Sequence, residues 1–238
     1  MSNRKRKVCV VITARPSYAR IRSALVAIRE HPDLELQLVV TASALLDRYG
    51  NAIRVIEKEG FKVDRRVYMI LEGESLVTSA KSTGMGLAEL ATVFDDLQPD
   101  AVVTIADRFE TISTAIAAAY MNIPLVHVQG GEITGSIDEK VRHSITKLAD
   151  LHLVSCEQAR ARVIRMGEQP ESVVVTGCPS IDIAKDVLQS PAIDIGHLFE
   201  RYGGVGERLD LSKGYLVVLQ HPVTTEYAES RAHVDETL

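Results

Sequence analysis

The sequence predicts an α/β fold with a doubly wound parallel sheet. Short apolar runs rich in valine and isoleucine recur along the chain, and segments with helical apolar spacing separate them. These runs are apolar throughout instead of alternating with polar residues, which indicates strands that are buried on both faces. Strands that alternate with helices make right-handed crossovers, so we expect one sheet with helices on both sides.

The elements follow one another in a regular order. Strands are predicted at residues 8–12, 34–41, 63–69, 101–105, 125–128, 151–154 and 173–175. Helices are predicted between them, at residues 18–29, 45–59, 76–97, 111–121, 138–149 and 157–166. Ile21, Leu25 and Ile28 show the helical spacing, and Gly60 suits the position after a helix end because glycine tolerates a left-handed backbone.

The glycines between residues 202 and 206 interrupt this alternation and suggest a linker. We predict a first domain at residues 1–200, a linker at 201–213, and the beginning of a second domain at 214–238. Residues 215–219 are apolar enough to form the first strand of that second domain. One strand cannot bury itself, so the second domain is expected to be truncated in this chain.

Composition excludes several classes of protein. The chain has 238 residues, of which 46% are hydrophobic and 25% charged, as in ordinary soluble globular proteins. Its net charge of −5 argues against nucleic-acid binding. No apolar run approaches the roughly 20 residues of a membrane span. The three cysteines are widely spaced, which suits buried thiols better than a disulfide framework or a metal site, so we predict a cytoplasmic protein.

Polar residues follow several predicted strands. Ligands of open parallel sheets bind outside the carboxyl ends of the strands, so these residues are the candidate site. Arg15 follows the first strand, Asp107 the fourth and Glu132 the fifth, while His221 follows the predicted strand of the second domain. Arg15 could bind phosphate or could be an exposed loop residue, and Asp107 could be a base or could cap the next helix.

The predicted helix after residue 137 adds three further candidates, Asp138, Arg142 and His143. Asp138 could equally be a first-turn acid favoured by the helix dipole, and the other two could face solvent. The chain contains no P-loop, no GxSxG elbow and no CxxC or HExxH metal motif. The residues alone therefore predict a site of mixed charge for an anionic ligand.

Six sequence stretches, which occur in collinear order, are more specific together than any single residue. They are LDRYGN at 46–51, DRFE at 107–110, GGEITGSID at 130–138, ITKL at 145–148, GCPS at 177–180 and LQHPVTT at 219–225. With them the chain resembles the hydrolysing UDP-N-acetylglucosamine 2-epimerases of sialic-acid synthesis, including the epimerase part of the animal bifunctional epimerase/kinase. The resemblance implies a glycosyltransferase-B-type fold of two Rossmann-like domains, with this chain as the N-terminal half.

The resemblance also implies a reaction. The family eliminates UDP from UDP-N-acetylglucosamine to give 2-acetamidoglucal, and water then adds to release N-acetylmannosamine. It uses no metal or nicotinamide cofactor, it binds a UDP sugar as its partner, and its full-length members form homo-oligomers, either dimers or tetramers. The alternative substrate is UDP-N,N′-diacetylbacillosamine. A non-catalytic sugar-nucleotide-binding half-protein is a second alternative, and a glycosyltransferase of the same fold is a weaker third.

Matched positions carry expected roles. The catalytic positions are Asp107, Glu132, Asp138 and His221, and the substrate-binding positions are Arg15, Arg142 and His143. Two residues depart from the family pattern: Gln129 stands where many relatives carry a glutamate, and Arg20 where a lysine is usual. The family's second domain is missing after Leu238, so we expect the isolated chain to be inactive.

Overall fold

The computed structural model describes residues 4–73, 75–105, 108–134, 137–189, 195–203, 205–207, 210, 213–220 and 229–238. The chain divides into two compact units, Met1–Pro191 and Ala192–Leu238. The predicted boundary at residue 200 therefore falls inside the second unit, which begins before helix α8 (Ile195–Tyr202).

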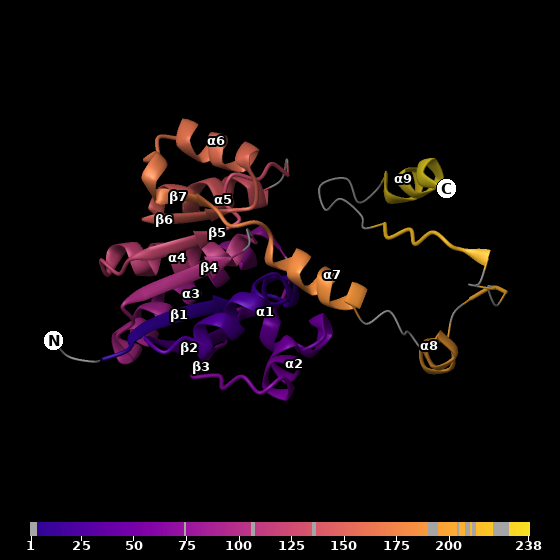
Figure 1. The fold of residues 1–238 in the computed structure, drawn as a ribbon, viewed down its shortest axis with the longest axis horizontal. Helices are drawn as coiled ribbons and strands as arrows, with labels where there is room; N and C mark the ends of the chain where they lie inside the picture. Colours follow the sequence, from indigo (N-terminus) through magenta and orange to yellow (C-terminus); the bar gives the residue numbers. More distant parts are fainter. Residues whose placement is uncertain are drawn as a thin grey trace. The chain divides into compact units, whose positions relative to one another are not determined.

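The first unit is built on one parallel sheet of seven strands (Figure 1). Its strands are β1 (Arg6–Ile12), β2 (Leu34–Thr41), β3 (Arg65–Val67), β4 (Ala101–Ile105), β5 (Leu125–Val128), β6 (Leu151–Val154) and β7 (Val173–Val175). They lie in the order β3-β2-β1-β4-β5-β6-β7, so the winding direction reverses between β1 and β4. This Rossmann-like arrangement confirms the predicted doubly wound sheet.

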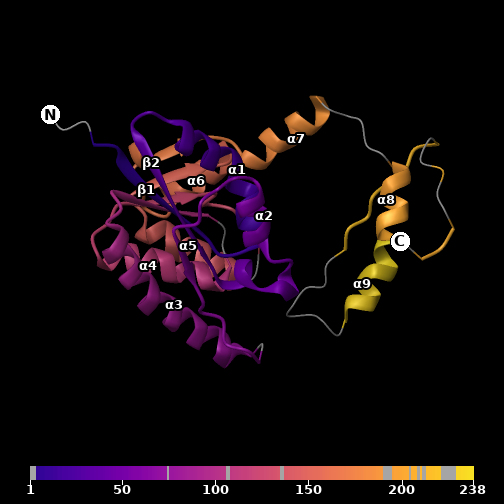
Figure 2. The same ribbon diagram turned by 90° about the horizontal axis from the view of Figure 1, so that it is seen from below.

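Helices cover both faces of this sheet. Those of the first unit are α1 (Arg15–Glu30), α2 (Ala52–Lys58), α3 (Leu76–Leu97), α4 (Ile112–Tyr120), α5 (Ile137–Leu148), α6 (Glu157–Arg165) and α7 (Pro179–Gln189). Figure 2 shows α3, α4 and α5 together on one side of the sheet, with α1 and α2 on the other. The second unit has α8 and α9 (Ser230–Thr237).

The central strands β1, β2, β4 and β5 contribute to two cores, which explains why most of their residues are apolar. On one face of β1, Val10 and Ile12 pack in a cluster with Ile21 and Leu25 of α1. On the other face, Cys9 and Val11 belong to the cluster that contains Phe94 and Leu90 of α3. Alternate residues of a strand point to opposite faces, so a strand between two helical layers is buried on both faces and is apolar at most positions.

Three elements depart most from their predicted bounds. Helix α1 begins at Arg15 instead of residue 18, since Pro16 is accommodated in the first turn. The helix predicted at 45–59 is reduced to α2, because Gly50 and Asn51 adopt left-handed backbones with φ of 83° and 42° and interrupt it. The strand predicted at 63–69 pairs with β2 only over residues 65–67.

The strand predicted at residues 215–219 is wrong for this structure. Residues 214–220 have no regular secondary structure, and the side chains of 215–219 are exposed. A strand needs a neighbour to accept and donate its ladder hydrogen bonds, and no strand is present among the described residues of the second unit. Separately, among the described residues no helix combines the length and apolar character needed to cross a membrane.

Candidate functional site

A cavity of about 340 Å³ lies at the carboxyl edge of the sheet. It is lined by Arg20, Gln129, Glu132, Ile133, Thr134, Arg142, Ser155 and Cys178. Most of these residues come directly after β5, β6 or β7, while Arg20 and Arg142 come from α1 and α5. The edge of the sheet is thus where the sequence predicts a ligand site, and Glu132 and Arg142 are brought together there.

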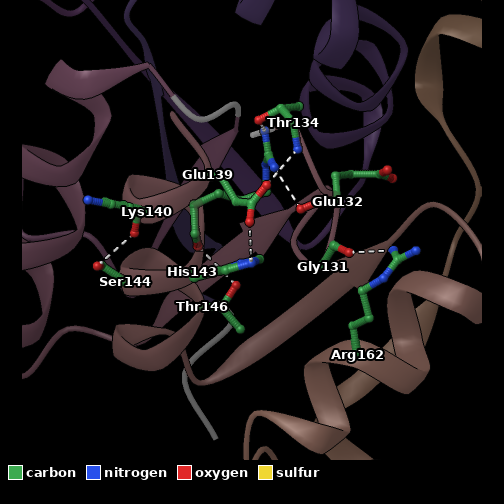
Figure 3. Close-up of polar contacts among 10 residues, drawn as sticks. Gly131, Glu132, Thr134, Glu139, Lys140, His143, Ser144, Thr146 and Arg162 are labelled. Carbon is green, nitrogen blue, oxygen red and sulfur yellow. Dashed lines mark hydrogen bonds and ion pairs between the residues drawn. The ribbon is translucent and has the colours of Figure 1, made fainter. Parts of the chain in front are cut away.

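Residues 131–134, which we call the β5 loop, are held by side chains from two helices (Figure 3). From α5, Arg142 donates through Nη1 to the Glu132 carbonyl oxygen at 2.7 Å and through Nη2 to Thr134 Oγ1 at 3.2 Å. From α6, Arg162 Nη1 donates to the Gly131 carbonyl oxygen at 2.8 Å. Hydrogen bonds from charged groups to backbone are among the stronger ones, so this loop is well fixed.

Glu132 is held by its side chain as well as by its backbone. The Ser155 hydroxyl, directly after β6, donates to Glu132 Oε1. This bond leaves the second carboxylate oxygen of Glu132 for other partners in the cavity. A carboxylate that is fixed in this way, with one oxygen free of Ser155, is suited to accept a proton from a bound ligand.

Arg142 and Arg20 place two guanidinium groups at the cavity. Arg142 is only 2% exposed, and its burial, together with the nearby charge of Arg20, lowers its pKa. Guanidinium groups stay protonated in proteins even so, and the cavity therefore favours an anion. Arg142 was expected to bind substrate; in the structure it lines the cavity and also orders the β5 loop.

The turn between β5 and its loop depends on an unusual backbone. Gln129 has a φ of 64° and Gly131 a φ of 80°, both in the left-handed region. The Gln129 side chain is fixed as well, since its Nε2 lies 3.0 Å from Cys178 Sγ, after β7. Backbone strain of this kind at a residue that lines a cavity is typical of functional sites.

Gly131 cannot be replaced without disturbing α6, which gives a testable prediction. A Cβ at Gly131 would lie 2.5 Å from the Ala159 carbonyl oxygen, whereas a Cβ at Gly60, with a similar φ of +81°, would meet nothing within 4 Å. Both glycine-to-alanine changes should lower the free energy of unfolding by about 1–2 kcal/mol, because the backbone at both positions is left-handed. Gly131→Ala should cost about 1–3 kcal/mol more for the collision. Urea unfolding of the two variants measures the difference, and equal losses would contradict this account.

The remaining predicted residues are placed less centrally. Arg15 is exposed at the start of α1, and its Nη1 lies 3.5 Å from the position of a Cβ on Gly50, outside the group that lines the cavity. Asp138 is half-buried in the first turn of α5. His143, one turn further, has Nε2 3.9 Å from Glu139 Oε1. Asp107 and His221 lie outside the described residues, so their predicted roles remain predictions.

Two residues beside the predicted ones had not been singled out. Ser155 follows β6 directly, so reading the residue after every strand would have found it. Glu110 lies within the DRFE stretch, and its side chain is fully buried with Arg108 Nε 3.0 Å from Oε1. Burial raises the pKa of Glu110 and so does the neighbouring Asp138, while Arg108 opposes them. Nothing in the sequence indicates that this acid is buried.

The described residues contain no group of three or more histidine, cysteine or acidic side chains arranged to hold a metal ion.

A comparison with known proteins identifies the family of the chain. The family model described as UDP-N-acetylglucosamine 2-epimerase matches residues 26–238. The chain belongs to this family. Its fold is therefore the N-terminal, Rossmann-like half of the glycosyltransferase-B-type arrangement, as the resemblance implied.

Several relatives are similar over most of this chain. The GDP/UDP-N,N′-diacetylbacillosamine 2-epimerase (hydrolyzing) of Campylobacter jejuni is 32% identical over 98% of the chain and 59% of its own length. The polysialic acid biosynthesis protein P7 of Escherichia coli is 36% identical over 98% of the chain and 58% of its own length. A crystal structure of a UDP-N-acetylglucosamine 2-epimerase superposes with a TM-score of 0.68 and 26% identity, covering 76% of this chain and 51% of that one. The chain thus spans less than two thirds of the relatives it matches.

Proposed function

We propose that this chain forms one wall of the active site of a hydrolysing 2-epimerase that converts UDP-N-acetylglucosamine to N-acetylmannosamine and UDP. The observation that carries the proposal is the cavity at the carboxyl edge of the sheet, where the fixed carboxylate of Glu132 lies among Arg20 and Arg142. A sugar nucleotide needs both kinds of group, since a proton leaves carbon and a diphosphate accumulates charge.

In the proposed reaction a carboxylate removes the proton from C2 of the sugar. The electron pair of that C–H bond forms the C1–C2 double bond, the C1–O bond breaks, and UDP leaves with its electrons, which gives 2-acetamidoglucal. Water then adds across the double bond, with its hydroxyl going to C1 and a proton returned to C2 on the opposite face. Asp107, Glu132 and Asp138 are the proposed acid/base carboxylates, and the arginines stabilise the leaving diphosphate.

A second substrate is supported by a specific observation. The C. jejuni relative, named for UDP-N,N′-diacetylbacillosamine, matches nearly the whole chain at 32% identity. That sugar differs from N-acetylglucosamine away from C1 and C2, so the same carboxylates would serve either substrate. The choice between the two substrates must come from residues that surround the rest of the sugar.

The test uses a protein that joins this chain to the second domain typical of its family. We expect UDP release from UDP-N-acetylglucosamine, with N-acetylmannosamine as the sugar product and deuterium at C2 when the reaction runs in heavy water. Preferred turnover of UDP-N,N′-diacetylbacillosamine would transfer the proposal to that substrate. Tight binding of UDP sugars without turnover would support a non-catalytic binding protein instead.

A further inference from the structure

His127 lies behind the β5 loop and is fully buried, although no role has been assigned to it so far. It is the third residue of β5 and pairs in register with His152 of β6, which is equally buried. Fully buried histidines are uncommon and usually have hydrogen-bond partners for their ring nitrogens. The contacts of this ring therefore need an explanation.

The contacts of Thr146 determine which ring nitrogen carries the proton. Thr146 Oγ1 lies 3.0 Å from the carbonyl oxygen of Arg142, one turn earlier on α5, and 3.2 Å from His127 Nδ1. The carbonyl oxygen can only accept, so the single Thr146 proton is donated to it. His127 Nδ1 must then donate to Thr146 Oγ1, and the ring is the Nδ1–H tautomer.

The surroundings of the other ring nitrogen, Nε2, favour the same tautomer. His127 Nε2 has no hydrogen-bond partner among the described residues, so nothing there stabilises a second proton. Burial, together with the neighbouring rings of His152 and His143, lowers the pKa of His127 to about 3. The imidazole is therefore neutral near pH 7 and acts as a hydrogen-bond donor of fixed direction.

The ring also supports the turn into the β5 loop. A Cβ at Gly130 would lie 3.0 Å from His127 Nδ1 and 3.1 Å from Thr146 Oγ1. The turn thus passes close to the hydrogen-bonded pair, and a side chain at residue 130 would require that pair to shift by a few tenths of an ångström. His127 therefore contacts both the turn and, through Thr146, helix α5.

We propose that His127 is a positioning residue of the cavity. It holds Thr146 through Nδ1–H, and Thr146 in turn bonds the Arg142 carbonyl at 3.0 Å. The Arg142 guanidinium then holds Glu132 and Thr134 in the β5 loop. This inference deepens the proposed function. Only the expected effect on kcat rests on that function, because the tautomer and the contacts exist without substrate.

Two pairs of variants test the role in the two-domain protein. Thr146→Val removes the hydroxyl and Thr146→Ser keeps it, while His127→Leu removes the donor and His127→Asn offers an amide N–H in its place. We expect Thr146→Val and His127→Leu to lower kcat by about 10²-fold, the scale of a small misplacement of a catalytic group. Thr146→Ser and His127→Asn should recover most of it, and KM should change little throughout.

A purely structural role gives a different pattern. The losses would then follow the unfolding stability of each variant, and kcat per folded molecule would stay at the wild-type value in all four. That result would overturn the proposal. The exposed His31 provides a matched control, since its ring lies in the α1–β2 turn and His31→Asn should leave kcat unchanged.

A measurement on the 238-residue chain tests the hydrogen bond without any substrate. Nitrogen-15 NMR of the imidazoles should show His127 with a proton on Nδ1 and none on Nε2 at pH 7, and no titration between pH 8 and 5. A protonated Nε2 or a titrating His127 would overturn the inference even if the proposed epimerase reaction is correct.

Discussion

Replacing any one of the three proposed carboxylates by its amide should lower turnover of the two-domain protein by about 10²-fold or more, the usual scale for losing acid/base catalysis. The variants are Asp107→Asn, Glu132→Gln and Asp138→Asn. An amide keeps the size and shape of the carboxyl group but cannot take a proton at neutral pH. The rate of UDP release under saturating substrate measures the effect.

Glu132→Gln is the most informative of the three. The amide oxygen that this substitution introduces can still accept from the Ser155 hydroxyl, and the backbone bond from Arg142 to residue 132 is untouched. The loop should therefore keep its position, so that a loss of turnover reports the missing acid/base group and not a displaced loop. Unchanged hydrogen-exchange protection of the Thr134 amide, which donates to Glu139, verifies this.

The matched control is Glu89→Gln, since Glu89 is an exposed acid on α3 and is not among the residues that line the cavity. It removes the same charge and should leave turnover unchanged. Near-normal turnover in all three carboxylate variants would show that none of them does the chemistry. A loss confined to one or two of them would assign the acid/base work to those residues.

The isolated 238-residue chain should fold but release no measurable UDP from UDP-N-acetylglucosamine. It spans 51% of the solved epimerase chain it superposes on, so the opposite wall of the site is expected to come from the rest of such a protein. One wall can contact the sugar and the diphosphate through Glu132 and the arginines, but it cannot exclude water from them.

Binding should be weak for the same reason. Losing half of a binding surface is expected to cost several kcal/mol, and each 1.4 kcal/mol is about tenfold in affinity, so micromolar binding would become millimolar or weaker. Calorimetry with UDP-N-acetylglucosamine measures this affinity, and urea unfolding with a single cooperative transition checks that the chain is folded. Turnover near one per second by the isolated chain would show that a second domain is dispensable.

The order of the elements was predictable because it depends on periodicity. Strands at 34–41, 101–105, 125–128, 151–154 and 173–175 match their predicted bounds, since continuous apolar runs between helices have few other stable arrangements. The failures are local. Left-handed residues at 50 and 51 shortened α2, and the apolar run at 215–219 has no partner strand among the described residues. Periodicity detects neither a backbone conformation nor a missing neighbour.

The sequence by itself also determined the edge of the sheet where the site lies, because polar residues follow the strands and parallel strands end at one edge. Only the tertiary structure decided how these residues work together. It shows that Arg142 reaches back to the β5 loop, that Ser155 holds Glu132, and that His127 is buried beneath Gly130. The first two contacts join residues 10 and 23 positions apart in the chain. The Arg142 contact depends on the packing of α5 against β5, and the Ser155 contact depends on the pairing of β5 with β6, neither of which is encoded by a spacing in the sequence.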